Sequence, residues 1–186
     1  AANFVNETVA FGIDSKFVIP DASAGIASFA NNIANVENVR GALGTAPGFG
    51  HDNNLEYQYF KSTYIDQFGA QPDTFCVNGY DFLMVSALAI EHAGKHNNTD
   101  SPTPLMVRNS LRAVMNSPGI KVGPSNIGEA LQLIRDGIDV DYSGSYGDND
   151  WDENGDIKGE ITYDIFQIDE LSKQWMSISQ QQLFVP

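Results

Sequence analysis

Residues 138–159 constrain the fold most, because this stretch is rich in turn-forming residues and leads into a segment with a strand pattern. Residues 152–155 (Asp-Glu-Asn-Gly) can close a tight reversal, since Asn and Gly tolerate positive φ angles. Residues 161–168 have the period-two texture of a strand. Tyr142 and Trp151 are apolar anchors within the polar stretch. The pattern predicts a structured, hairpin-like corner that feeds a strand late in the chain.

Charge and composition argue against several classes of partner. Of the 186 residues, 42% are hydrophobic. This content is enough for a hydrophobic core and argues against a globally disordered chain. Ten basic residues against 24 acidic ones leave a net charge of −14, which argues against nucleic acid or an anionic membrane as partner. No run of about 18 apolar residues occurs, so the sequence predicts no membrane-spanning helix. Cys76 is the single cysteine and cannot form an internal disulfide.

The first quarter of the chain alternates helical and strand patterns. Residues 2–12 read as the end of a helix, and the chain begins without Met or a signal-peptide pattern, so we expect a processed or truncated product. A short strand at 16–19 precedes a loop of small residues that begins at Asp21, then a short helix at 28–34 and a strand at 39–45. This order predicts an α/β fold with an open parallel sheet, in which ligands lie beyond the carboxyl ends of the strands.

The remaining chain is mostly helical in pattern. Residues 54–68 predict an aromatic-rich helix, and 74–77 a short strand or bend. Asn78, with Asp81 three residues on, resembles a capping box that starts a helix at 79–93. That helix is apolar almost all round, so we expect it to be deeply buried and to stop at Gly94. The further elements expected are a polar loop at 95–104, helices at 105–115 and 126–136, and strands at 120–122 and 174–178.

Oxygen-bearing side chains recur at alternate positions in the corner, as in the first half of an EF-hand calcium loop: Asp150, Asp152, Asn154 and Asp156. Gly155 would permit the sharp turn. However, Ile161 stands at position twelve, where such a loop has a bidentate glutamate. The alternative is a turn whose Asp and Asn side chains hydrogen-bond the backbone, and the sequence favours that alternative.

Other patterns do not add up to a metal site or an enzyme. His92 and His96 have the spacing of metal ligands on a helix, but Gly94 is expected to end the helix between them and no third ligand is near in sequence. His51 is interpreted as a loop histidine and Cys76 as a buried structural thiol. The sequence contains no nucleophile elbow, phosphate loop or dinucleotide fingerprint, so we expect neither an enzyme nor a bound cofactor.

The corner resembles the late signature of the type I periplasmic solute-binding proteins, the branched-chain amino acid and amide receptors of ABC importers. The matching residues are Gly137, Ile138, Tyr142, Gly144, Gly147 and the run Trp151-Asp152-Glu153-Asn154-Gly155-Asp156. Three further blocks carry the resemblance: residues 17–21, residues 41–47 and the run from Phe60 to Gly94. As a pattern it covers about the whole chain, and it corresponds to the second half of the family's chain.

The resemblance implies a type I periplasmic-binding-protein-like architecture with two α/β lobes, only partly present here. Residues 1–46 and 160–186 would belong to the second lobe, and residues 47–159 to the first. Pro47 and the neighbourhood of Glu160 would be hinge crossings. The first half of the family's chain, which carries most of the first lobe's sheet, is missing from this sequence. Exposed sheet edges are therefore expected, and self-association would cover them.

The resemblance also implies ligand-binding residues. Asp21 corresponds to an acidic side chain that pairs with the ligand ammonium, and Phe75 to an aromatic residue that lines the side-chain pocket. From the residues alone, the favoured interpretation of Asp21 is a loop carboxylate that caps a helix or faces solvent, and that of Phe75 is a core residue.

The function implied is that of a periplasmic or extracytoplasmic solute-binding component of an ABC importer. It would bind an amino acid or similar small polar ligand in an interlobe cleft and present it to a membrane permease. Two alternatives remain at the level of sequence. One is a calcium-stabilised structural or interaction module, and the other is a sensory ligand-binding ectodomain with the same fold.

Overall fold

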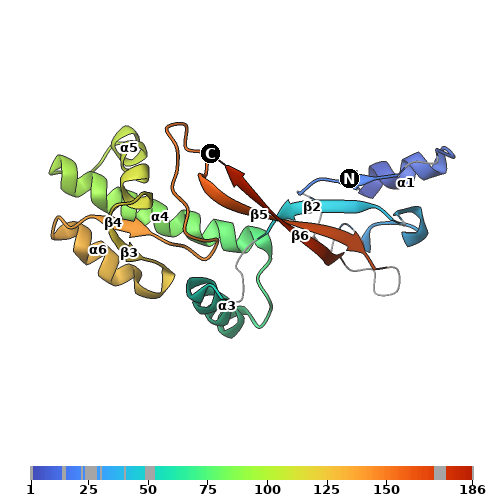
Figure 1. Ribbon diagram of the computed structural model, residues 1–186, viewed down its shortest axis with the longest axis horizontal. Coiled ribbons are helices and arrows are strands. Elements are labelled where there is room, and N and C mark those ends of the chain that lie inside the picture. The colour runs from blue at the N-terminus through green and yellow to red at the C-terminus, as the bar shows by residue number, and fades with distance from the viewer. Residues whose placement is uncertain are drawn as a thin grey trace. The chain divides into compact units, whose positions relative to one another are not determined.

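The computed structural model describes residues 2–13, 16–21, 23, 29, 31–39, 41–48, 53–169 and 175–185. The chain divides into two compact units, one formed by Ala1–Gly48 and Ile161–Leu183, the other by Phe49–Glu160 and Phe184–Pro186. Figure 1 shows the elements of both, and each unit is described by itself. Both combine strands that pair in parallel with flanking helices, so the mixed α/β class expected from the sequence is confirmed.

The first unit is built on a mixed sheet. Its four described strands have the order β1 (Val18–Ile19), β2 (Leu43–Pro47), β5 (Gly159–Ile168), β6 (Trp175–Val185). Strand β1 pairs in parallel with β2, whereas β2 and β5 are antiparallel, with Leu43 opposite Gln167. Helix α1 (Ala2–Ala10) and the 3-10 turn η1 (Val36–Val39) accompany the sheet. The buried apolar side chains of this unit form one core: Val5, Ile19, Phe29, Ile33, Val39, Ala42 and Ile168.

The second strand begins later than the sequence pattern indicates. Val39 ends η1 and is not extended, and the Ala42 amide donates to the Val39 carbonyl at 2.9 Å. Gly41 has φ +74°, a left-handed conformation that reverses the chain before β2 starts at Leu43. The expected strand at 39–45 was therefore wrong at its beginning. The expected helix at 28–34 lies partly outside the described residues.

The second unit begins with well-capped helices. Helix α3 (Leu55–Phe68) starts at Asn54, whose side chain accepts hydrogen bonds from the Glu56 and Tyr57 amides, and ends at Gly69 with φ +67°. Helices α4 (Thr74–Asn97) and α5 (Pro104–Met115) follow. A parallel pair of strands comes next, in which β3 (Ile120–Val122) and β4 (Val140–Tyr142) are connected through the 3-10 turn η2 (Pro124–Asn126) and helix α6 (Ile127–Arg135).

Helix α4 is longer than expected at both ends. It begins at the Asp73 cap, whose carboxylate accepts from the Cys76 amide, and it continues through Gly94 to Asn97. The expected strand at 74–77, the cap at Asn78 and the stop at Gly94 were wrong. At Gly94 a Cβ would lie 3.0 Å from the Thr99 carbonyl oxygen, so glycine allows the loop after the helix to fold back closely. The chain has glycine there because of packing, not because the helix ends.

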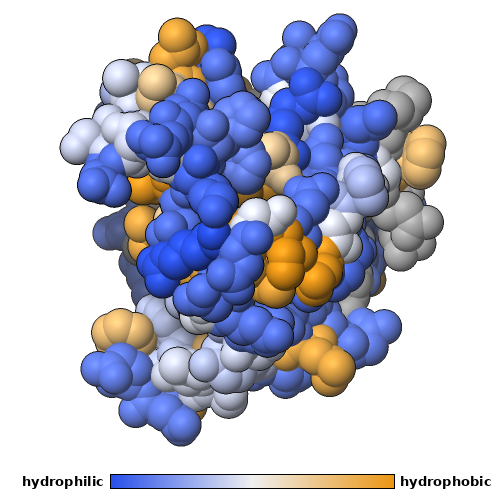
Figure 2. All heavy atoms as spheres, turned by 90° about the vertical axis from the view of Figure 1, so that its left-hand side faces the viewer, coloured by the Kyte–Doolittle hydropathy of each residue, from blue (hydrophilic) through white to orange (hydrophobic). Residues whose placement is uncertain are grey.

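Only one side of α4 is buried, which also differs from expectation. Its inward side packs into a core shared with α5, α6 and β4 and contains Val85, Leu88, Ala89 and, at the strand, Val140 and Tyr142. The opposite side carries four large apolar residues with 48–64% exposure, here named the α4 stripe: Phe75, Phe82, Leu83 and Ile90. Figure 2 shows one face of the surface, on which apolar patches lie between mainly hydrophilic side chains.

The late corner has the form that the sequence predicts. Trp151 and Ile157 form an antiparallel bridge around the turn at 152–155, and the Asp152 amide donates to the Asp156 carbonyl at 2.8 Å. Strand β5 follows directly. No helix of the described residues has the length and apolar character needed to cross a membrane.

Candidate functional site

A buried carboxylate organises the loop that follows β4. Asp81 projects from α4 with 9% exposure, and its Oδ1 accepts from the Tyr142 hydroxyl at 2.8 Å and the Ser145 amide at 2.9 Å. Its Oδ2 accepts from the Tyr146 amide at 2.7 Å. Asp81 therefore lies within α4 and tethers residues 142–146 to the helix. The sequence-based expectation that it belongs to a helix cap was wrong. Its carboxylate is engaged by donors of the chain itself, so its role is to position the loop.

Two opposing effects act on Asp81. Burial raises the pKa of the Asp81 carboxyl, and the hydrogen bonds from Tyr146, Ser145 and Tyr142 partly offset this rise. Burial, together with the charge of Asp81, raises the pKa of the Tyr142 hydroxyl, which therefore stays a donor. The backbone passes so close that a Cβ on Gly144 would lie 2.5 Å from Asp81 Oδ2. Residue 144 must be glycine for the carboxylate to reach its donors.

Helix α3 holds the same loop from another direction. The Asn54 side-chain amide donates to the carbonyls of Gly144 at 3.2 Å and Ser145 at 3.3 Å, while its oxygen caps α3. Two residues on, the Glu56 carboxylate accepts from the Ser125 amide at 2.8 Å and the Ser125 hydroxyl at 2.7 Å. These contacts join α3 to η2 and to the loop after β4. The second unit thus has a preorganised polar network at one end of its parallel strands.

A small, mainly apolar cavity lies beside this network. Its volume is about 240 Å³, and it is lined by the beginning of α4, the loop after β4 and the corner. Its main lining side chains are Asp81, Phe82, Val85, Met115, Trp151 and Ile157. A cavity of this volume and lining fits a small apolar group, with the Asp81 end as its polar limit.

The two residues expected to bind ligand lie on different units. Asp21 is exposed in the turn that follows β1 and Pro20, at the carboxyl end of that strand. Phe75 lies in the first turn of α4 with 48% of its surface exposed, so it is not a core residue. The position of Asp21 beyond a parallel strand is the one that the sequence predicts.

The carboxylates proposed as calcium ligands make hydrogen bonds within the chain. Asp150 accepts from the Ser117 amide at 3.1 Å and the Ser117 hydroxyl at 3.2 Å. Asp152 accepts from the amides of Asn154 at 2.8 Å and Asp156 at 2.9 Å, and the Asp156 bond in particular lowers the pKa of Asp152. This is the hydrogen-bonded turn named as the alternative. Among the residues that the structure describes, no three His, Cys, Asp or Glu side chains are grouped so that they could hold a metal ion.

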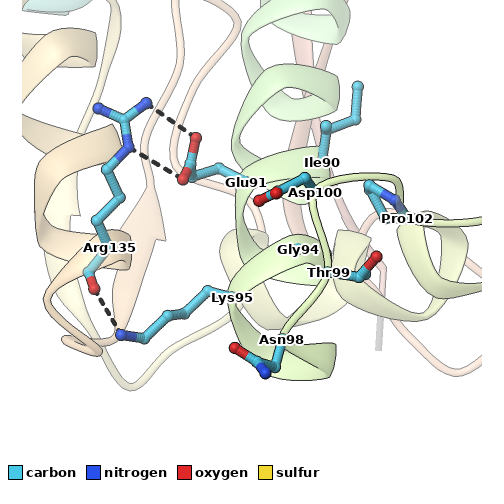
Figure 3. A pocket seen from close by; sticks show the side chains of 9 residues that line it. All are labelled: Ile90, Glu91, Gly94, Lys95, Asn98, Thr99, Asp100, Pro102 and Arg135. Carbon is cyan, nitrogen blue, oxygen red and sulfur yellow. Dashed lines mark hydrogen bonds and ion pairs between the residues drawn. The ribbon is translucent and has the colours of Figure 1, made fainter.

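A wider and more polar depression lies where α4 approaches α6 (Figure 3). Its volume is about 630 Å³. Arg135 donates from Nε and Nη2 to the two oxygens of Glu91, at 3.0 Å each, and the Lys95 ammonium donates to the Arg135 carbonyl at 2.7 Å. Glu91, Lys95 and Arg135 are therefore already paired with one another across its wall.

The chain forms two α/β units, each with strands that pair in parallel and flanking helices, and this fold is similar to that of the type I periplasmic binding proteins. The leucine-binding protein LivK from Thermotoga maritima MSB8 superimposes on 96% of this chain with a TM-score of 0.60 and 19% sequence identity. An ABC transporter substrate-binding protein from Desulfitobacterium hafniense aligns over 95% of the chain, with 15% identity and a TM-score of 0.46.

The alignment covers 41% of LivK and 39% of the second protein, so this chain spans about two-fifths of the length of each. No family profile and no curated protein sequence matches the chain. At this level of identity the comparison establishes the fold alone.

The Asp81 network was not recognised from the sequence. The sequence features that could have indicated it are a single carboxylate between Tyr80 and Phe82 in an apolar helix and the glycines of the loop 144–147. Sequence spacing does not show that these segments, about 60 residues apart, meet in space.

Proposed function

We propose that this chain is part of an extracytoplasmic solute-binding protein that delivers a small polar ligand, such as an amino acid, to the permease of an ABC importer. The fold supports this proposal, because the neighbour with the better superposition is described as a leucine-binding protein and the other as an ABC substrate-binding protein. Proteins of this class bind their ligand and release it unchanged. We therefore propose a binding role and no catalysed reaction.

The observation that carries the proposal is Asp21 at the carboxyl end of β1, a parallel strand. Ligands of open α/β sheets lie beyond the carboxyl ends of the strands, and a carboxylate there suits the ammonium of an amino acid. Phe75, in the first turn of α4, is the second residue that we propose as a ligand contact, through its apolar ring. The division of the chain into two compact units supports the lobe assignment: 1–46 with 160–186, and 47–159.

A binding experiment on Asp21 tests this function. We expect L-leucine, or another amino acid from a panel of twenty, to give measurable heat in calorimetry and a higher thermal midpoint. Asp21→Ala should weaken that binding at least tenfold, because the ligand ammonium loses its counter-charge. Asp66→Ala, an exposed carboxylate change on α3, is the matched control and should leave affinity unchanged. Equal affinity for the Asp21 variant and the wild type would remove Asp21 from the site.

Self-association through the α4 stripe is a second proposal. The four side chains together expose roughly 400 Å² of apolar surface, and two such faces approach the lower size limit of specific interfaces. The stripe itself carries no charge, so the faces can meet despite the net charge of −14 on each copy. We propose that a second copy of the chain covers this face.

A further inference from the structure

The continuity of α4 brings two histidines together. His92 and His96 are one helical turn apart, and the helix runs through Gly94 between them, contrary to the sequence-based expectation. Their rings are nearly parallel, with 5.7 Å between centroids and 9° between planes. Two imidazoles at positions i and i+4 of an unbroken helix share one face, which is the spacing that helical zinc sites use.

Ser110 of α5 holds the inner histidine. Its hydroxyl lies 3.0 Å from His92 Nδ1, and the serine is 4% exposed, so a rigid part of the core orients the ring. With Nδ1 engaged by the hydroxyl, Nε2 is the nitrogen left for another partner. Metal-binding histidines are usually held in this way, because a hydrogen bond at one ring nitrogen directs the other toward the ion.

The two rings border a cavity of about 370 Å³ at the turn between α6 and β4. Asp139 is also in its wall. Lys95 lines the cavity too, but its ammonium donates to the Arg135 carbonyl. The cavity therefore has two imidazoles in its wall, and in the described part of the chain Asp139 does not join them in a three-ligand group.

We propose that His92 and His96 bind a borderline divalent transition-metal ion of the Cu²⁺, Ni²⁺ or Zn²⁺ type. Imidazole nitrogens select these ions over Ca²⁺ and Mg²⁺, which prefer oxygen ligands. Two protein ligands leave the other coordination positions to water, as in an exchangeable site and unlike a closed structural zinc site. The ion would tie two successive turns of α4 together. This proposal is independent of the solute-binding function.

Nickel titration of the chain without a polyhistidine tag tests the site. At pH 7.5 we expect one Ni²⁺ per chain by calorimetry, and His92→Gln or His96→Gln should each weaken binding at least tenfold. The chain has three histidines, so His51→Gln is the matched control and should bind as the wild type does. Cu²⁺ electron paramagnetic resonance should show two coordinated nitrogens in the wild type and one in either α4 variant.

Two results would overturn the proposal. One is unchanged Ni²⁺ affinity in His96→Gln, a variant of an exposed residue that should fold normally. The other is an equal loss in His51→Gln, which would mean nonspecific histidine binding. Ser110→Ala gives a further readout. It should weaken Ni²⁺ binding several-fold if the hydroxyl directs His92, while a purely structural role would change the metal-free thermal midpoint and leave the affinity intact.

Discussion

The Asp81 carboxylate is the single residue on which the loop after β4 depends most. Asp81→Asn keeps one oxygen acceptor but places an amide N–H opposite a backbone N–H, because the chain offers three donors to two oxygens. We expect a loss of about 1–3 kcal/mol in the free energy of unfolding, measured in urea. Asp66→Asn on α3 is the control and should change the free energy of unfolding little. A loss in Asp81→Asn no larger than in this control would contradict the role of Asp81 in holding the loop after β4.

The same variant has a predicted pH dependence. Because the pKa of Asp81 is raised in the folded state, the folded chain takes up a proton at a higher pH than the unfolded chain does. Its contribution to stability is therefore fully present below the unfolded pKa of about 3.9 and is lost as pH rises through the folded pKa. The stability deficit of Asp81→Asn should therefore be larger on the acidic side of the folded pKa than at pH 7, as urea denaturation over a pH series would show. A deficit that shrinks on acidification would show that the hydrogen bonds outweigh burial.

Gly144 gives a second prediction at this scale, with an internal control. A Cβ there would lie 2.5 Å from Asp81 Oδ2 and 2.8 Å from Tyr142 Cε1, so Gly144→Ala must break the tether or move the loop. We expect a loss above about 2 kcal/mol. Gly128→Ala in α6 meets nothing within 4 Å and should stabilise by about 0.5–1 kcal/mol, through helix propensity. Similar urea midpoints for the two variants would refute the close approach.

At the scale of elements, α4 shows the limit of periodicity as a guide. Its apolar residues surround the axis, which favours a fully buried helix, yet Phe82 and Leu83 are both 64% exposed. Periodicity describes the helix, whereas burial depends on which other elements are present to cover it. The caps of α3 differ from the burial of α4, because they form locally. Asn54 and Gly69 act within one turn of the chain, through local hydrogen bonds and a left-handed φ.

The exposed stripe predicts concentration-dependent association. Phe82→Glu should shift the chain toward the monomer in sedimentation-velocity experiments, because a charge is then buried in any interface that uses the stripe. Leu55→Glu, at a residue of α3 that is 81% exposed, provides the matched control and should leave association unchanged. If both variants associate like the wild type, the α4 stripe is not the contact.

At the scale of the whole molecule, the order of strand and helix patterns in the sequence predicted the correct α/β fold class. The resemblance of residues 137–156 to solute-binding proteins agrees with the superposition on LivK, although only 19% of residues are identical. Such agreement is possible because a fold depends on the pattern of turns, caps and buried faces more than on residue identity. The assignment of Asp21 and Phe75 as ligand contacts remains a prediction, to be decided by the calorimetry described above.

By itself the sequence determined what is local: the turn at 152–155, the strand that follows it, the helix at 54–68 and the charge that argues against nucleic acid. Only the tertiary structure decided that Asp81 is buried against Tyr142, that α4 is open on one side, and that His92 lies against Ser110. Turns and caps depend on hydrogen bonds between residues a few positions apart. Burial and pairing depend on segments that meet only when the chain has folded.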